Sequence, residues 1–513
     1  MVINKKPRQL TSKMLLLGID IGTSSVKVSV VDAASQKALA SAQYPDSESP
    51  ITVHQPGWAE QSPDMWWEQA QMALQRCHAT QTYNPADIKA IGIAYQMHGL
   101  VLVDKDQHLL RDSIIWCDSR AVEIGDKAFD EIGHEQCLSH LLNSPGNFTA
   151  AKLAWVKQNE PEIYSRIDKV MLPGDYIAMK LTGEVTTSAS ALSEGIFYDF
   201  QGNRLSDEVL NYFGFSTNLF PPIKPVFAPH GQLLQSVAEK LQLPAGIPVA
   251  YKAGDQPNNA LSLNVLKPGE VAATAGTSGV IYGVSDELAF DLQSRVNTFA
   301  HVNYTDELKR LGVLLCINGT GSLYRWAKSL FGAGLSYNEM NNLAAHAPLG
   351  SAGLRILPFG NGAERMLNNK LVGVHFHHID LNLHTQSHML RAVQEGIACA
   401  FRYGLDIMRE NGMNPTVIRA GKANLFLSDL FTQAFVNVTG VPVELYRNDG
   451  SVGAALGAGI GAGIFSTPEE AFARMECLQT ITPTTKDYEP VYQEWKDLLT
   501  AQLLSEQMFI GSL

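Results

Sequence analysis

The feature that most constrains the fold is a turn that occurs twice, about half a chain length apart. Residues 20–26 read DIGTSSV and residues 275–280 read AGTSGV, and each sequence lies between two apolar runs. Thr23 and Thr277 are therefore separated by close to half of the 513 residues. Because a short Gly-Thr-Ser turn between apolar runs is typical of a β-hairpin, the repetition predicts two similar lobes, each containing one such hairpin.

The rest of the chain alternates strand-like and helix-like segments. Residues 88–94 form an apolar run typical of a buried strand, whereas Ser62 and Pro63 are typical of the N-cap and the first position of a helix. Helical periodicity returns over residues 387–404 and 427–440. This alternation predicts an α/β fold whose sheets are covered by helices on both faces.

A boundary between the lobes is expected within residues 244–257, where turn-forming Pro and Gly residues flank a short apolar strand. No low-complexity linker divides the chain there or elsewhere. We therefore predict an N-terminal lobe at residues 14–254 and a C-terminal lobe at residues 255–490.

The composition excludes several classes of protein. Hydrophobic residues make up 45% of the chain and charged residues 18%, which is the balance of an ordinary globular protein rather than of a disordered tail or a coiled coil. The formal net charge is −12, and the sequence contains no extended basic segment. These features argue against a binder of nucleic acid or of membrane surfaces.

The cysteines and the N-terminus predict the compartment. The six cysteines are scattered without CxxC spacing, which favours reduced thiols over disulfides or a metal site. Residues 1–13 are basic but lack the apolar region of a secretory signal, and no run reaches the roughly 20 apolar residues that a membrane helix needs. We therefore expect a soluble, cytoplasmic protein without a membrane or nucleic-acid partner.

Each Gly-Thr-Ser turn can bind an anion, because glycine lets the backbone approach a phosphate and the hydroxyls add donors. Two such tips that face each other would hold a nucleotide triphosphate, whereas either one alone could be a plain tight turn. Asp20 ends the first strand beside its tip, where a carboxylate can bind Mg²⁺ directly or through water. The sequence contains neither a GxxxxGK[ST] loop nor a GxGxxG after a strand, so the P-loop and Rossmann interpretations lack support.

Polar side chains also follow three predicted strands. Asp255 can orient a substrate hydroxyl and accept its proton, although an ordinary Asp pKa of about 3.9 makes it a weak base; a helix cap is the alternative. His98 and Asp118 follow two other strands, where α/β proteins build small-ligand sites, and each can hydrogen-bond a polyol hydroxyl.

Three later segments are weaker candidates for contact with a nucleotide base or a metal. Residues 420–424 read AGKAN after a short strand, and residues 449–455 open a helix rich in Gly and Ala. Both suit an adenosine pocket, but tight helix packing explains the second equally well. Three histidines stand in VHFHH, yet no carboxylate or cysteine has matching spacing, and alternation along a strand explains the first two. This disfavours a metal site there.

Taken in order, these segments resemble the FGGY carbohydrate kinases. The motifs are GIDIGTSSVK, YQMHG, IIWCDSR, LPGDYI, AGDQPNNALS, AATAGTSGV, LPFGNGAER and DGSVGAALGA. The resemblance covers about Met14 to Phe465, and the MHG and WCDSR segments are most similar to the xylulokinase group of that family. It implies two actin-like (ribonuclease H-like) ATPase lobes with a nucleotide in the inter-lobe cleft.

The reaction implied by the resemblance is transfer of the ATP γ-phosphate to O5 of D-xylulose, which gives D-xylulose 5-phosphate and ADP with Mg²⁺ as cofactor. The matched residues are Asp255 as catalytic base; Met97, His98, Asp118 and Gln256 at the sugar; Asp20 at the metal; Gly22, Thr23, Ser24, Gly276, Thr277 and Ser278 at the phosphates; and Trp326, Gly421, Lys422 and Asn424 at the nucleotide. Two departures are AGKA in place of a GGGA-type adenosine loop, and GAERML in place of GERTP. The first leaves the nucleotide preference open, and Lys422 is either solvated or in contact with a phosphate.

Several alternatives stay open at this point. The acceptor could be L-ribulose, gluconate or glycerol within the same family. An actin-like or Hsp70-like ATPase switch is a different class, and the segment after Phe465 is short for the peptide-binding domain that an Hsp70-type protein would need. A sugar sensor without catalysis is a third reading, against which Asp255 argues. The oligomeric state is open, with a homodimer as one option.

Overall fold

The computed structural model describes residues 13–510, which form two compact units. Unit 1 contains the described residues up to Ile132 together with Pro145–Asn264 and Asp449–Met475, and unit 2 contains Gly133–Ser144, Val265–Asn448 and the chain from Glu476 onward. Residues 1–12, which the sequence interpretation took to lack a secretory signal, lie outside the described residues. Within residues 13–510, no helix combines the length and the apolarity that a bilayer crossing requires.

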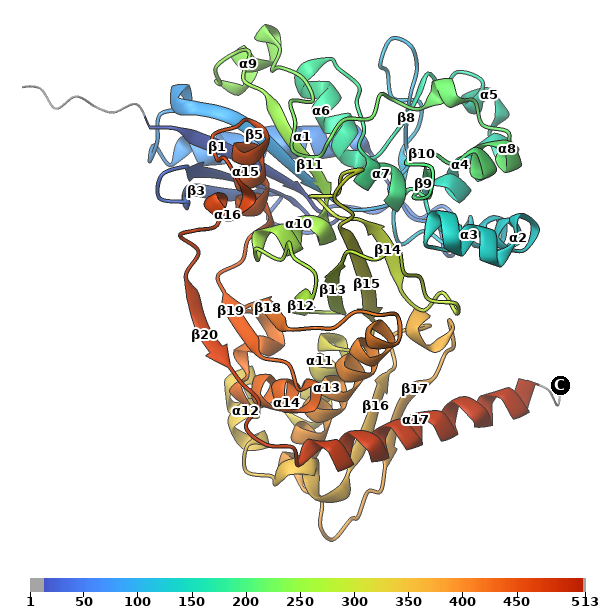
Figure 1. The fold of residues 1–513 in the computed structure, drawn as a ribbon. Helices are drawn as coiled ribbons and strands as arrows, with labels where there is room; N and C mark the ends of the chain where they lie inside the picture. The colour runs from blue at the N-terminus through green and yellow to red at the C-terminus, as the bar shows by residue number, and fades with distance from the viewer. Residues whose placement is uncertain (1–12, 511–513) are drawn as a thin grey trace, which may run out of the picture. The chain divides into compact units, whose positions relative to one another are not determined.

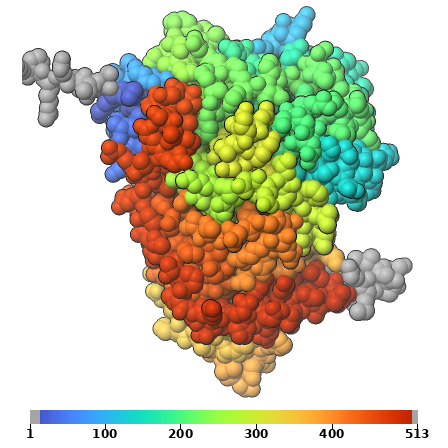
Figure 2. Space-filling model, in the orientation of Figure 1, coloured from blue at the N-terminus to red at the C-terminus, as the bar shows by residue number. Residues whose placement is uncertain are grey.

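The units differ from the expected division at residue 254 in three places. Residues 255–264 continue unit 1, residues 133–144 belong to unit 2, and residues 449–475 return to unit 1. In the space-filling view, the red residues of this returning segment lie against the blue and green residues of unit 1 (Figure 2). The exchange reflects packing, since the helix in the returning segment covers the sheet of unit 1.

Unit 1 is built on a five-stranded sheet with the order β11-β5-β1-β2-β3 (Figure 1). Its strands are β1 (Leu15–Ile21), β2 (Val26–Asp32), β3 (Lys37–Tyr44), β5 (Ile88–Tyr95) and β11 (Val249–Gly254). β1 and β2 form the predicted antiparallel hairpin, and β5 and β11 run parallel to β1. The carboxyl ends of these three parallel strands therefore meet at one edge of the sheet.

Unit 2 repeats this strand order in a seven-stranded sheet, β14-β15-β13-β12-β18-β19-β20. Its strands are β12 (Glu270–Ala275), β13 (Gly279–Ser285), β14 (Asn297–Ala300), β15 (Leu311–Ile317), β18 (Val417–Gly421), β19 (Val443–Tyr446) and β20 (Cys477–Ile481). β12 and β13 form the second hairpin, and β18 and β19 run parallel to β12. The run β15-β13-β12-β18-β19 thus has the same pairing as β3-β2-β1-β5-β11, which confirms the prediction of two similar lobes.

Helices cover both faces of the unit 1 sheet. α1 (Pro63–Ala79) and α6 (Pro173–Thr182) pack on one face, against the side chains of Leu17, Ile19 and their neighbours. α15 (Gly450–Gly461) packs on the other face so closely that a Cβ on Gly18 would lie 1.8 Å from the carbonyl oxygen of Ser451. Since only small residues allow this approach, the Gly- and Ala-rich sequence of α15 is explained by tight helix packing.

The predicted helices are present. Ser62 caps α1, because its hydroxyl accepts a hydrogen bond from the Met65 amide, and Pro63 is the first residue of that helix. The periodic segments 387–404 and 427–440 correspond to α13 (Gln386–Glu410) and α14 (Asp429–Thr439), and α13 packs against α14 and the sheet of unit 2.

The remaining elements are shorter or peripheral. The other helices are α2 (Val122–Ile132), α3 (His134–Leu141), α4 (Thr149–Asn159), α5 (Pro161–Tyr164), α7 (Ala189–Glu194), α8 (Asp207–Phe213), α9 (Gln235–Leu241), α10 (Asp255–Ser262), α11 (Gly321–Phe331), α12 (Tyr337–Ala344), α16 (Pro468–Ala471) and α17 (Tyr488–Ile510). The small strands are β4 (Glu60–Gln61), β6 (Val101–Val103), β7 (Ser113–Ile114), β8 (Lys169–Met171), β9 (Tyr198–Asp199), β10 (Arg204–Leu205), β16 (Arg355–Phe359) and β17 (Gly373–His377). The strand β17 carries His375 and His377, as alternation predicted.

Candidate active site

The parallel strands of unit 1 bring three predicted site segments together. Ile21 on β1, Tyr95 on β5 and Gly254 on β11 are register partners, so the chain leaves all three strands at the same level of the sheet. Asp20 lies just before this level, and Asp255 is the residue directly after it. The segment from Gln96 to His98 leaves β5 between them.

Asp20 and Asp255 are partly buried carboxyl groups, and the charge of Asp20 acts on Asp255. Burial, with a contribution from the Asp20 charge, raises the pKa of Asp255 to about 7. Burial and the charge of Asp449 raise the pKa of Asp20 to about 6, against the opposing effect of Lys27. Asp255 is therefore a much stronger base than the ordinary Asp that the sequence interpretation assumed.

A third carboxylate, Asp449, reaches this group from the N-terminus of α15. It caps the helix by accepting hydrogen bonds from the amide and the hydroxyl of Ser451, at 3.0 and 2.7 Å, and it forms an ion pair with Lys27 on β2. The next residue, Gly450, stands so near Asp20 that a Cβ there would lie 2.2 Å from Oδ2 of Asp20. The start of α15 therefore forms one wall of the carboxylate group.

The first hairpin tip is held by side chains from the rest of unit 1. The Thr23 hydroxyl donates to Oε1 of Gln96 at 3.1 Å and accepts from the indole N–H of Trp116 at 2.9 Å. The amide N–H of Gly22 donates to the Ser25 carbonyl, and Ser24 is exposed. Among the described residues, none bonds the main-chain N–H groups of Thr23 and Ser24, so these donors are available to an anion.

The sugar-binding candidates Met97 and His98 follow β5, which is the neighbour of the strand that ends before Asp255. Met97 is buried, and its Cγ would lie 2.6 Å from a Cβ placed on Gly254. The Nδ1 atom of His98 is 2.9 Å from the carbonyl oxygen of Glu194, and its ring packs edge-on against Phe148. Because a carbonyl only accepts, Nδ1 of His98 carries the hydrogen. The imidazole is thus held in one orientation.

Unit 2 contains a cavity of about 590 Å³ beside the second hairpin tip. The tip residues Gly276 and Thr277 line it, and so does Asn424, whose loop follows β18. The remaining walls combine aromatic, apolar and amide side chains: Tyr324, Tyr337, Leu425, Leu427, Asn338 and Asn341, with Arg325 and Ser428. A cavity of this size, with apolar walls and a few polar groups, suits a ligand such as a nucleotide.

Comparison with known proteins decides the family. The N-terminal and C-terminal domain models of the FGGY family of carbohydrate kinases match residues 15–262 and 271–464. The chain belongs to the FGGY family of carbohydrate kinases. It is therefore a sugar phosphotransferase that uses ATP, and its two-domain α/β fold is the predicted fold of this family.

Relatives of named activity align with most of this FGGY kinase. It is 31% identical to the xylulose kinase of Escherichia coli K12, over 90% of this chain and 92% of that protein. A crystal structure of xylulose kinase from Rhodospirillum rubrum aligns with a TM-score of 0.85 at 26% identity, over 95% of this chain and 98% of that one. A gluconate kinase structure from Lactobacillus acidophilus aligns at 22% identity with a TM-score of 0.86, over 97% and 100% of the two chains, and this similarity concerns the fold alone.

Asp118 of this FGGY kinase lies in a buried network of hydrogen bonds and ion pairs. Asp118 is fully buried, accepts hydrogen bonds from the amides of Ala59 and Arg120 at 2.6 and 2.8 Å, and is paired with the Arg120 guanidinium at 2.7 Å. Arg120 is itself paired with Glu60 and stacked over Trp58, 3.9 Å from the ring centroid. Since both carboxylate oxygens are engaged inside the fold, Asp118 anchors the loop that carries Trp116. Its role at the sugar stays a prediction of the sequence.

Three nucleotide candidates do not line the larger cavity of unit 2. Trp326 lines a second cavity of about 260 Å³ with Gly360 and Val374, rather than the larger cavity. The exposed ammonium of Lys422 donates to Oε1 of Gln479 at 3.2 Å, and a contact of Lys422 with a phosphate stays a prediction of the sequence. Gly421 ends β18 and does not line the larger cavity, whereas Asn424 does. Ser278, in the second tip, is partly buried.

Sequence reasoning missed several side chains in these places. Asp449, Lys27 and the cavity residues Tyr324, Arg325 and Tyr337 were not among its candidates. For Asp449 the available signal was its N-cap position before a Gly-rich helix; for the cavity residues it was the GTG turn of residues 319–321, which hydrogen-bonds the second tip. These signals are weak, because residues that come together only through tertiary packing share no motif in the sequence.

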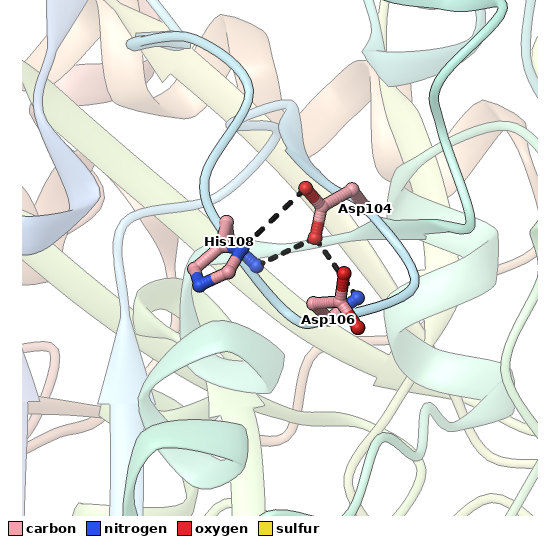
Figure 3. Close-up of side chains that lie close together, drawn as sticks. All are labelled: Asp104, Asp106 and His108. Atoms are coloured by element: carbon pink, nitrogen blue, oxygen red, sulfur yellow. Dashed lines mark hydrogen bonds and ion pairs between the residues drawn. The ribbon is translucent and has the colours of Figure 1, made fainter.

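Two groups of possible metal ligands have atoms that already bond within the chain. Asp104, Asp106 and His108 lie close together in an exposed turn (Figure 3). Oδ1 of Asp104 already accepts the amides of Asp106 and His108 at 2.9 Å each, which makes the group a local turn. In the VHFHH segment, Nε2 of His375 is bonded to the Val372 carbonyl at 2.7 Å.

Proposed function

We propose that this FGGY kinase transfers the γ-phosphate of ATP to O5 of D-xylulose, giving D-xylulose 5-phosphate and ADP. The observation that carries the proposal is the placement of Asp255, directly after β11, under the influence of the Asp20 charge and next to Gly254, which Met97 contacts. The choice of D-xylulose is supported by the xylulose kinases to which the chain is similar over nine tenths of its length.

Asp255 is proposed as the general base. Its carboxylate would accept the proton of the O5 hydroxyl as the bond to phosphorus forms, and a pKa of about 7 suits this transfer near neutral pH. Gln256 hydrogen-bonds Asp255 and is proposed to contact the sugar from the same turn of α10. Phosphoryl transfer needs little covalent chemistry from the protein, so the main contribution of these residues is orientation.

Met97 and His98 are proposed to bind the sugar. The His98 main-chain carbonyl accepts from the Thr149 hydroxyl at 3.2 Å and from the Lys152 ammonium at 3.0 Å, so this loop is held from α4 as well as from Glu194. A fixed imidazole can discriminate among hydroxyl positions, because a misplaced hydroxyl would leave a polar group unpaired.

The cavity of unit 2 is proposed as the nucleotide site, with Gly276, Thr277 and Ser278 at the phosphates and Asn424 at the nucleoside. The main-chain N–H groups of Thr23 and Ser24 in unit 1, which no described residue bonds, are proposed as further phosphate donors, together with Gly22. A nucleotide in an inter-lobe cleft stays a prediction of the sequence, as do the cytoplasmic location and the homodimer.

The carboxylates of unit 1 fit a divalent cation. The Asp20 charge raises the proton affinity of Asp255, and the Asp449 charge raises that of Asp20. Hard oxygen ligands of this kind are those that Mg²⁺ prefers. Asp449 is already paired with Lys27, so we propose Asp20 as the ligand, directly or through water. Bound Mg²⁺ would neutralise charge on the phosphate oxygens, while Asp20 holds its position against the N-terminus of α15.

The test is acceptor-dependent release of ADP, measured with D-xylulose, L-ribulose, gluconate and glycerol under the same conditions. A clear preference for D-xylulose in kcat/KM supports the proposal. Preference for gluconate or glycerol overturns the assigned substrate but leaves the kinase. ATP hydrolysis that no sugar stimulates would instead favour an ATPase switch and would remove the proposed role of Asp255.

A further inference from the structure

Glu194, the last residue of α7, is a buried carboxyl group that the proposed mechanism does not use. It is 1% exposed, and its Oε1 atom has no hydrogen-bond partner in the described part of the chain. No ion pair within the described residues involves it. Burying a carboxyl oxygen without a hydrogen-bond partner costs free energy. The presence of Glu194 inside the candidate site therefore needs a functional explanation.

Its position connects the two segments proposed to hold the sugar and the base. Oε2 of Glu194 would lie 2.6 Å from a Cβ placed on Gly254, the residue directly before Asp255. Cγ of Met97 meets the same point at 2.6 Å. The Glu194 carboxyl and the Met97 side chain thus fill the space that a side chain at position 254 would need, which explains why this position is glycine.

The same residue holds the end of β5. Its main-chain carbonyl is the partner of Nδ1 of His98, and its side chain hydrogen-bonds the Tyr95 hydroxyl. Glu194 therefore contacts the chain on both sides of the site, at the Tyr95–His98 segment and at the Gly254–Asp255 turn.

The charges around Glu194 favour its protonated form. Asp255 on α10 and Asp175 on α6 face it, and Asp175 is paired with Lys252 at 2.6 Å. Lys152 on α4 is nearby, but its ammonium donates to the carbonyls of His98 and Ile115 at 3.0 Å each. Burial, followed by the charges of Asp255 and Asp175, raises the pKa of Glu194 well above its usual range, against the lowering effect of the hydrogen bonds to Tyr95 and His98.

We propose that Glu194 acts in its uncharged form as a positioning residue, which holds the Met97–His98 segment and the Gly254–Asp255 turn in one arrangement. The proposal rests on the proposed function of Asp255. Ionisation of Glu194 would place an unpaired negative charge beside Asp255 and disturb this arrangement, so the wild-type enzyme should lose activity at alkaline pH. A neutral side chain of the same shape should keep the arrangement and remove that loss.

The experiment compares wild type with Glu194→Gln, Glu194→Ala and, as a surface control, Glu184→Gln, whose carboxylate is exposed. We would measure kcat and KM for D-xylulose from about pH 6 to about pH 10. Glu194→Gln should stay within about threefold of the wild-type kcat at neutral pH and should lack the alkaline decline. Glu194→Ala should lower kcat about tenfold or more, and Glu184→Gln should match the wild type throughout.

The outcomes separate this inference from the proposed function. If wild type shows no xylulose-dependent ADP release, or if Asp255→Asn is fully active, the proposed function fails. If Asp255→Asn is inactive while Glu194→Gln keeps the alkaline decline of the wild type, the inference about Glu194 is wrong. Should Glu194→Ala fail to fold, the pH profile of the isosteric Gln variant still decides.

Discussion

A Cβ atom placed on Gly450 would lie 2.2 Å from Oδ2 of Asp20, although the two residues stand near opposite ends of the sequence. The contact exists because α15 returns to cover the sheet of unit 1 and presents its first turn to the end of β1. The position of the Asp20 carboxylate therefore depends on the absence of a side chain at Gly450.

Gly450→Ala should therefore displace the Asp20 carboxylate and lower kcat about tenfold or more, because a sub-van der Waals approach to a carboxylate cannot be absorbed without movement. Steady-state ADP release measures the effect. In an Asp20→Ala background the clash is gone, so adding Gly450→Ala should change kcat no further. Equal effects of Gly450→Ala in the two backgrounds would show that the clash with Asp20 is not the cause.

Asp255→Asn should lower kcat by orders of magnitude while sugar binding stays measurable by calorimetry, since the amide keeps the shape but cannot accept the proton. In the wild type, the base must be ionised to act. Its pKa of about 7 predicts that kcat/KM falls as the pH decreases through about 7. A pH profile that stays flat down to about pH 5 would contradict this assignment.

Asp20→Asn should stabilise the metal-free protein at pH values above about 6. The pKa of Asp20 is about 6 in the folded protein and 3.8 ordinarily, so the folded state binds the extra proton between these values and loses stability as the pH rises through them. An asparagine mimics the protonated form. Calorimetry in the presence of a chelator should show a Tm gain of a few degrees at alkaline pH that vanishes in acid; a gain that is the same at both pH values contradicts the argument.

Asp118→Asn should destabilise unit 1 rather than weaken sugar binding selectively. Removing the charge leaves the buried Arg120 with only Glu60 as its acidic partner, and breaking a buried pair typically costs about 3 kcal/mol. Thermal unfolding should show a clear loss for Asp118→Asn. Asp46→Asn breaks an exposed pair with Arg76 and serves as the control, with little expected change. A raised KM for D-xylulose with unchanged Tm would return Asp118 to the sugar site.

Asn424→Gly should raise the KM for ATP several-fold without changing the KM for the sugar. Asn424 lines the cavity of unit 2, and glycine tolerates its positive φ of 54° while removing the amide. Lys422→Ala is the matched comparison from the same loop and should leave both constants unchanged, because the Lys422 ammonium bonds Gln479 outside the cavity lining. If Lys422→Ala raises the KM for ATP and Asn424→Gly does not, the nucleotide contacts Lys422 instead of Asn424.

The local parts of the fold were readable from the sequence. The two Gly-Thr-Ser hairpins, the Ser62 cap of α1 and the strand of residues 88–94 follow from turn chemistry, capping and apolar periodicity, which act between residues close along the chain. The order of the motifs identified the family, and the position of Asp255 at a strand end predicted a group at the edge of the sheet.

Packing between distant segments settled the rest. Asp118 and Asp255 each lie in a polar segment that follows a strand. Asp118 is paired with Arg120, which is itself paired with Glu60, whereas the charge of Asp20 raises the pKa of Asp255. The return of α15 to unit 1, and the burial of Glu194 against Gly254, likewise depend on which surfaces meet. Periodicity and turn residues specify a segment through its own neighbours, whereas the charge, burial and partners of a side chain are properties of contacts that form only when the whole chain has folded.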